Sequence, residues 1–244
     1  MLAKVPGSWR RIRAHAGWEL RLLLRNGEQL LLVFIIPIAL LVGLNALRAT
    51  WLGPITPVPT VLAVAILATA FTSLAIGTGF ERRSGALEFL GTTPLTRVDL
   101  LVGKLGATVC LTAVSMASIV GVGLMLGWQP SGEWAAAVLV ALLGVVAAGS
   151  WAIAMAGALR AEAVLALANG IFVLLVMFGG VIIPASAMPA PFSAIVPYLP
   201  SGALADGLRS GLAEQAWPWP ALAVLCAWSL AGILLARRTF RWQP

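Results

Sequence analysis

The sequence predicts an all-α, polytopic protein that crosses a membrane about six times. Of the 244 residues, 60% are hydrophobic and only 10% are charged, and the mean hydropathy of +0.97 is far above that of a water-soluble domain. Six apolar stretches each approach the roughly 20 helical residues that a bilayer requires. Lysine and arginine gather on alternate connections between these stretches. We therefore expect one transmembrane domain over residues 1–244.

The six expected spans contain no Asp, Glu, Lys, Arg or His. They cover residues 29–47, 58–80, 105–127, 134–158, 163–183 and 218–236. The short connections between them leave no room for a large soluble domain. A net charge of +7 does not indicate a nucleic-acid partner, because the basic residues lie between apolar runs and not on a folded polar surface.

Positive charge predicts the orientation of the spans. With both termini in the cytoplasm, only Arg48 and Arg209 of the 16 Lys and Arg residues fall on the outer side. Tryptophan prefers the membrane interface, and five tryptophans fall at outer span ends: Trp51, Trp128, Trp134, Trp217 and Trp219. Both patterns favour cytoplasmic termini in a multi-pass protein of a plasma membrane. The many Ala, Gly and Arg residues are compatible with a bacterial source.

Residues 1–28 are expected to form a cytoplasmic tail and an amphipathic helix on the inner membrane surface. Apolar residues recur there at helical spacing, at Trp9, Ile12, Ala16, Leu20 and Leu23. Such a helix either anchors the topology or also contacts a cytoplasmic partner. Farther along, Pro37 should kink the first span unless a neighbouring group replaces the hydrogen bond that proline cannot make.

The cytoplasmic loop 81–104 reads ERRSGALEFLGTTPLTRVDLLVGK and is rich in charge. Leu87 and Leu90 predict the apolar side of a short helix that begins near Ser84 and ends before Pro94. An exposed apolar helix needs a cover, and we favour a partner protein over the membrane. The alternative is a solvated turn whose arginines only enforce topology.

The segment 184–217 is interrupted by proline at positions 184, 189, 191, 197 and 200. Its apolar pieces are too short to span, so we expect short outer-face or re-entrant helices between spans five and six.

Several chemical functions find no support in the sequence. No G-x-x-x-x-G-K-[ST] motif is present, so no nucleotide phosphate cradle is expected. His15 is the only histidine and has no neighbouring Cys or paired carboxylates, which argues against a metal site or a catalytic nucleophile. Cys110 and Cys226 lie in apolar runs and are expected to pack as small hydrophobic side chains. We expect no catalytic residues.

The loop motifs acidic-Arg, Gly-x-Leu-Glu, x-Thr-Pro-Leu-x-Arg and Gly-Lys resemble the permeases of ATP-binding-cassette exporters of type 2. This family includes exporters of drugs, polysaccharides and nodulation factors. The resemblance implies two permease subunits with two separate ATPase subunits, which bind the ATP and Mg. It also makes the loop a coupling helix, with candidate ATPase contacts at Glu81, Gly85, Leu87, Glu88, Leu90, Pro94 and Leu95.

Small polar side chains in the spans have two possible roles. They either let helices pack and hydrogen-bond across their interfaces, or they form a mildly polar wall along a substrate pathway. The pathway candidates are Asn45, Thr69, Thr72, Ser73, Thr112, Ser115 and Asn169.

Apolar spans without charge suit a hydrophobic or amphipathic substrate such as a drug, an antibiotic or a lipid-like molecule. Export of a polysaccharide or a lipid-linked glycan is the alternative within the resembled family. An ATP-independent carrier is the alternative of another class, although it would need ion ligands at membrane depth that the expected spans lack.

Overall fold

The computed structural model describes residues 7–48, 56–214 and 216–239, and helices are the regular secondary structure of this part of the chain. The first half contains α1 (Ser8–Arg25), α2 (Gly27–Leu30), η1 (Leu31–Ile35), α3 (Ile36–Arg48), α4 (Pro57–Ile66), η2 (Leu67–Ser73), α5 (Leu74–Arg83) and α6 (Ala86–Gly91). The second half contains α7 (Arg97–Met125), α8 (Trp134–Ala158), α9 (Ala161–Phe178), η3 (Ala185–Ala187), α10 (Phe192–Ile195), η4 (Val196–Tyr198), α11 (Pro200–Ala213) and α12 (Trp219–Thr239). The expected tail before Gly7 and the outer Trp51 lie outside the described residues.

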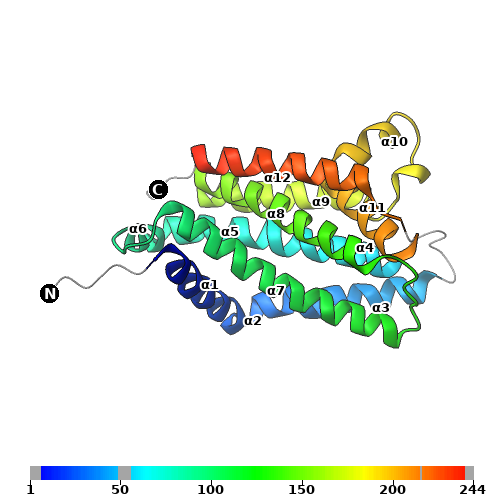
Figure 1. Ribbon diagram of the computed structural model, residues 1–244, viewed down its shortest axis with the longest axis horizontal. Helices are drawn as coiled ribbons and strands as arrows, with labels where there is room; N and C mark the ends of the chain where they lie inside the picture. The colour runs from blue at the N-terminus through cyan, green and yellow to red at the C-terminus, as the bar shows by residue number, and fades with distance from the viewer. Residues whose placement is uncertain (1–6, 49–55, 215, 240–244) are drawn as a thin grey trace.

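The expected six spans are confirmed. The helices long and apolar enough to cross a membrane are Gly27–Leu47, Pro57–Arg83, Arg97–Met125, Trp134–Ala158, Ala161–Phe178 and Trp219–Thr239. They run alongside one another as a bundle, with α6 at one end and α10 and α11 at the opposite end (Figure 1). We call these the α6 end and the α11 end; the charge distribution predicts that the α6 end is cytoplasmic.

Two span boundaries differ from the expected ones. Helix α7 begins at Arg97, before the expected start at residue 105, because Thr96 and Asp99 form a reciprocal capping box that fixes its first turn. Helix α9 ends at Phe178 and not at residue 183, because Gly179 is followed by Gly180 with φ +82°, a conformation that stops a helix.

Helix α8 is the central element of the bundle and packs against α5, α11 and α12. Its many Ala and Gly residues allow these neighbours to approach closely. A Cβ atom added at Gly144 would lie 2.6 Å from a methyl carbon of Leu204 in α11. Small residues therefore bring the short helix α11 into the core of the bundle.

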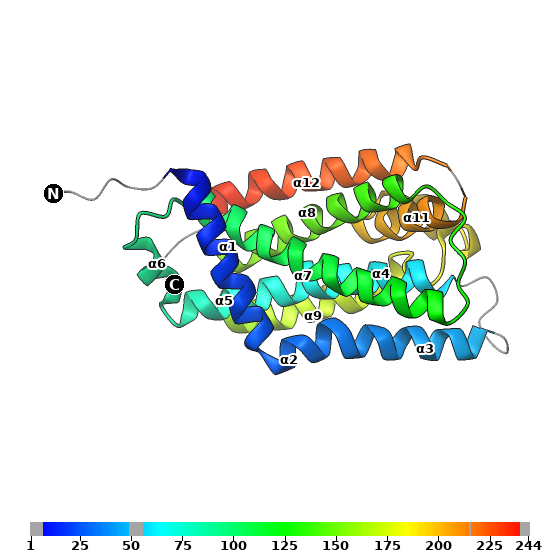
Figure 2. The same ribbon diagram turned by 60° about the horizontal axis from the view of Figure 1, so that its bottom comes forward.

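Helix α1 crosses α7 at the α6 end of the bundle (Figure 2). Four residues of the predicted apolar stripe, Ile12, Ala16, Leu20 and Leu23, are half-buried, whereas the fifth, Trp9, is 67% exposed. The apolar stripe found in the sequence is thus partly turned toward the protein itself. Contact between this helix and a membrane surface stays a prediction.

The helix around Pro37 departs from regular α-helical geometry, and a side chain of another helix supplies the hydrogen bond that proline cannot make. The segment η1 just before it is π-helical. In an α-helix the carbonyl of Val33 would accept the N–H of residue 37, which proline lacks. Ser115 on α7 donates to that carbonyl over 2.7 Å. The distortion is thereby held by a contact between the first and third spans.

The proline-interrupted segment forms η3, α10, η4 and α11, which are short helices as expected, while their entry into a membrane stays a prediction. Arg209 on α11 donates to the Gly180 carbonyl over 3.0 Å and to the Val181 carbonyl, and it pairs with Asp206 at 2.7 Å. The end of α9 is therefore fastened to α11.

Candidate functional site: the α6 loop and the adjoining groove

Helix α6 projects at one end of the bundle between α5 and α7 (Figure 1). Gly85 has φ +76° and makes the turn between α5 and α6, which a residue with a side chain would adopt only with strain. The short helix that the sequence predicted from Leu87, Leu90 and Pro94 is present as Ala86–Gly91.

The exposed apolar face of α6 is not the one that the sequence indicated. Leu87 is fully buried in a cluster of the chain's own residues, which consists of Leu87, Leu100, Ile153, Ala154 and Ala236. Leu90 is half-buried against the same cluster. Phe89, by contrast, is 72% exposed. The expectation that Leu87 contacts a partner is therefore corrected: it fastens α6 to the bundle, and Phe89 is the apolar side chain that points outward.

The other loop candidates divide between the outer surface and the body of the protein. Glu88 and Pro94 are exposed, and Gly85 and Leu95 are half-buried. They lie on the same loop as Phe89 and stay candidate contacts for a partner. Glu81 differs, because it takes part in an ion cluster beneath the loop.

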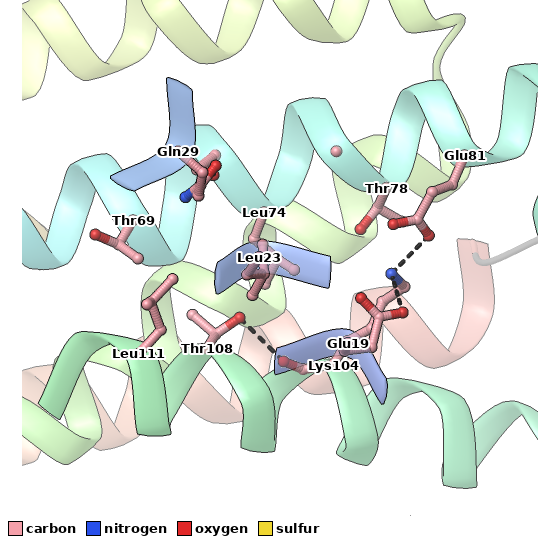
Figure 3. A pocket seen from close by; sticks show the side chains of 12 residues that line it. Glu19, Leu23, Gln29, Thr69, Leu74, Thr78, Glu81, Lys104, Thr108 and Leu111 are labelled. Atoms are coloured by element: carbon pink, nitrogen blue, oxygen red, sulfur yellow. Dashed lines mark hydrogen bonds and ion pairs between the residues drawn. The ribbon is translucent and has the colours of Figure 1, made fainter. Parts of the chain in front are cut away.

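The ion cluster joins three helices at the α6 end. Lys104 on α7 is almost entirely buried and lies 2.8 Å from Glu19 on α1 and 2.6 Å from Glu81 on α5. Figure 3 shows its ammonium group between the two carboxylates. A buried lysine is stable only when its charge is compensated, so this residue needs both partners. Lys104 therefore joins α1, α5 and α7 at this end of the bundle.

His15 extends the cluster along α1. Its Nε2 lies 3.5 Å from Glu19 and makes no hydrogen bond among the described residues. Burial lowers the pKa of His15 below its ordinary value of 6.5; Glu19 opposes this effect and Lys104 adds to it. A second link joins the same helices, since Arg11 on α1 pairs with Asp99 on α7 at 2.8 Å. Helix α1 is thus attached to α7 through charged side chains.

A groove of about 420 Å³ lies between the first span, η2 and α9. It brings together four of the predicted pathway residues, Thr69, Thr72, Ser73 and Asn169. Both π-helical segments, η1 and η2, contribute to its wall, and π-helices are frequent at functional sites.

The groove has polar groups without partners. Ser73 donates to the side-chain oxygen of Gln29 over 2.8 Å, which leaves the Gln29 amide nitrogen as a buried donor with no hydrogen-bond partner among the described residues. The Thr72 hydroxyl is also buried and has no hydrogen-bond partner among the described residues. Since buried polar groups are normally hydrogen-bonded, these two are candidate contacts for a polar atom of a ligand.

The remaining pathway candidates do not line the groove. Ser115 is engaged with Val33, and Thr112 is buried within α7. Asn45 lines a separate hollow of about 50 Å³ near the opposite end of the first span. Among the described residues, Ser115 makes a hydrogen bond between helices, as the alternative role in helix packing predicts, whereas the buried Thr112 hydroxyl has no partner.

Sequence reasoning missed Gln29, Glu19 and Phe89. Gln29 was detectable as a polar residue at the start of an apolar span. The pairing of Glu19 with Lys104 joins positions 85 residues apart, and nothing in the sequence links them. Phe89 was passed over because the leucines beside it matched the expected helical spacing.

A bundle of six helices long and apolar enough to span a membrane, with a short helix projecting at one end, defines a polytopic α-helical membrane protein. The sequence matches the family described as ABC-2 family transporter protein over residues 55–238, three quarters of the chain. The chain belongs to this family, whose members are the permease subunits of ABC transporters and work with an ATPase subunit. Helix α1 and the first span precede the matched region. No curated protein matches the sequence.

Proposed function

We propose that this chain is the membrane permease of an ABC exporter that moves a hydrophobic or amphipathic substrate outward across a bacterial plasma membrane. The observation that carries the proposal is helix α6, which projects from the bundle with Phe89 exposed and is fixed from behind by Leu87. A separate ATPase subunit binds ATP and Mg, and two permease copies assemble with two ATPases.

Helix α6 has the properties of a coupling helix. Its exposed Phe89 offers an apolar anchor and Glu88 a charged neighbour, which is a common combination at protein interfaces. Burial of Leu87 ties the helix to α7, α8 and α12. A displacement of α6 by a bound partner would therefore also displace the spans that contact Leu87.

The ion cluster carries the same movement to α1. Because Lys104 holds Glu81 at the end of α5 and Glu19 on α1, displacement of α5 also moves α1. The ATPase drives this change only if it contacts α6 differently in its two nucleotide states, since that difference supplies the coupling free energy.

The groove beside η2 is the proposed substrate path. It combines apolar side chains with the uncharged donors of Gln29 and Thr72, which suits an amphipathic molecule that carries hydrogen-bond acceptors. Such a molecule is a drug, an antibiotic or a lipid-like compound. A second permease copy facing the groove would close it from the bilayer.

Co-purification with a candidate ATPase tests the proposal. We expect Phe89→Asp to weaken complex formation at least tenfold, because it replaces an interface anchor with a charge. Phe192→Asp is the matched control, since Phe192 is 52% exposed at the opposite end of the bundle. Undiminished binding of Phe89→Asp, or equal loss with both variants, would contradict α6 as the docking element.

Substrate class is tested on the assembled complex. We expect amphipathic drugs to stimulate ATP hydrolysis, and Gln29→Leu to raise the drug concentration needed for half-maximal stimulation several-fold. Stimulation by lipid-linked glycans alone would favour the glycan exporter. Transport by the permease without any ATPase would favour an ATP-independent carrier.

A further inference from the structure

A second hollow of about 220 Å³ lies on the other side of η2 and α9 from the groove. Its floor is formed by Gly144, Ala147 and Ala148 of the central helix α8. The side chains around it are apolar, and they come from η2, α8, α9, α11 and α12, with Leu199 in the turn before α11. The hollow is therefore built by five helices and is not a gap between two of them.

The side chains that line the hollow, among the residues that the structure describes, offer an occupant no free hydrogen-bonding group. The polar ones are Trp151 and Trp228, and both indole N–H groups are already used. Trp151 donates to the Trp228 carbonyl over 3.1 Å, and Trp228 donates to the Tyr198 carbonyl over 2.9 Å. An enclosed apolar cavity of about 150 Å³ in a soluble protein stays dry and accepts benzene, and an apolar lining of the same kind favours hydrocarbon over water in this hollow.

The hollow lies between two spanning helices whose outer faces are largely exposed. Helix α9 packs chiefly on α5 and η2, whereas α12 packs on α8 and α11. Only 17% of the α9 span and 28% of the α12 span is buried within the chain. The rim residues Ile171, Leu175 and Trp228 are half-buried, while Leu204 and Leu225 deep in the hollow have 1% and 0% of their surface exposed.

We propose that this hollow is a binding site for an acyl chain of a bilayer phospholipid. An empty hollow forfeits the dispersion contacts of all the atoms that line it, and the medium outside its mouth is hydrocarbon chains. A lipid tail fits a lining whose described side chains have no free hydrogen-bonding group, whereas a transported amphipathic molecule would leave its acceptors unpaired here. The site does not depend on the docking of α6 to an ATPase.

The hollow and the groove share η2 and α9 as a common wall. Leu67 and Phe71 of η2 face the hollow, whereas Thr69, Thr72 and Ser73 face the groove. Ile171 and Leu175 of α9 face the hollow, whereas Asn169 faces the groove. A lipid tail in the hollow thus packs against η2 and α9 on the side away from the groove and supports the groove wall that they form.

Photolabelling in lipid nanodiscs tests the site. The probe is phosphatidylcholine with a diazirine near the end of one acyl chain, and labelled residues are located by mass spectrometry. We expect label on Trp151 and Met155, half-buried residues of the central helix α8 that line the hollow, and we call this deep labelling. Label confined to the exposed outer faces, such as Leu174, would overturn the proposal.

Filling variants provide the matched comparison. Leu175→Trp narrows the hollow and should reduce deep labelling at least fivefold, while Leu174→Trp, on the neighbouring 59% exposed face, should leave it unchanged. Ile171→Phe is a second filling variant should the first fail to fold, as judged by thermal unfolding. Equal deep labelling in filled and control variants would contradict the site.

A second probe separates a lipid tail from another hydrophobic occupant. A photoactivatable hydrophobic drug without a phospholipid headgroup is added to the same nanodiscs. Deep labelling by phosphatidylcholine that the drug does not displace supports the lipid site. Deep labelling by the drug alone would assign the hollow to transported molecules and overturn the proposal.

Discussion

Gly103 determines how closely α1 approaches α7. A Cβ atom at this position would lie 2.5 Å from Cδ2 of His15, whose ring is enclosed and has little room to move. We expect Gly103→Ala to destabilise the α1 contact by about 1–3 kcal/mol, as overpacking does. Thermal unfolding of the purified protein measures this change.

Gly106→Ala is the control for that substitution. One turn along the same helix, the added Cβ would lie 3.8 Å from the Cβ of Ala16, an ordinary contact. Because alanine also favours the helix over glycine, Gly106→Ala should be neutral or slightly stabilising. Equal effects of the two substitutions would contradict the close approach of His15 to α7.

His15 gives the protein a stability that depends on pH. Burial lowers its pKa in the folded state below 6.5, against the opposing effect of Glu19 and with the added effect of Lys104. Below about pH 6.5 the unfolded chain takes up a proton that the folded chain resists, so the free energy of unfolding falls as pH falls, by at most about 1.4 kcal/mol per unit. The contribution is fully present above the ordinary pKa.

The measurement is thermal unfolding between pH 7.5 and 5, compared with His15→Gln, which carries no titrating ring. We expect the curve of the variant to be flatter over this interval. A steeper loss of stability in His15→Gln would mean that the charged imidazole is favoured by Glu19 in the folded protein.

Single residues also show where sequence reasoning reaches its limit. Leu87 and Leu90 were identified as the apolar side of α6, and they do share a side, but it is the inner one. An apolar side chain looks the same in a sequence whether it packs on its own chain or on a partner. Only the position of α7, α8 and α12 around Leu87 distinguishes the two cases.

At the scale of elements, the Lys104 cluster is the joint between α1, α5 and α7. We expect Lys104→Met to destabilise this joint by about 3–5 kcal/mol, because it leaves two carboxylates facing each other without a cation. Exposure of the Glu81 side chain, at 32%, places the effect toward the lower end of that range. Hydrogen exchange of α1 measures its release.

Removal of all three charges distinguishes electrostatics from packing. In the triple variant Lys104→Met, Glu19→Gln and Glu81→Gln, no uncompensated charge remains, and we expect α1 to regain most of its protection. Failure of the triple variant to recover would show that the lysine acts through its shape and not through its charge.

The elements themselves were largely predictable, since the six spans, the short loop helix and the broken segment before α12 all follow from hydropathy, charge and proline. Their packing was not. The first span and α7 meet through Val33 and Ser115, and α9 is fastened to α11 through Arg209, by contacts between distant parts of the chain. Neither contact leaves a periodic pattern in the sequence.

At the scale of the whole molecule, the predicted orientation places the α6 end in the cytoplasm. A cysteine at position 84 on the loop should then react with a membrane-impermeant maleimide only after cells are opened, while a cysteine at position 194 on α10 should react in intact cells. Both native cysteines are first removed by Cys110→Ala and Cys226→Ala. Ser84→Cys or Ala194→Cys is then introduced, and the extent of maleimide labelling is compared between the two variants. The reverse labelling pattern would show that the protein has the opposite orientation in the membrane.

The bond between Ser115 and the Val33 carbonyl has an evolutionary consequence. Proline at position 37 makes that carbonyl depend on a donor from another helix, so the two positions are coupled although they lie 78 residues apart in the chain. Homologues that keep the proline should retain a hydroxyl at the position of Ser115, and those that have lost the proline are free to carry alanine there. The order of change is constrained as well: a lineage can lose the proline first at little risk, whereas loss of the hydroxyl first leaves a buried acceptor short of a partner.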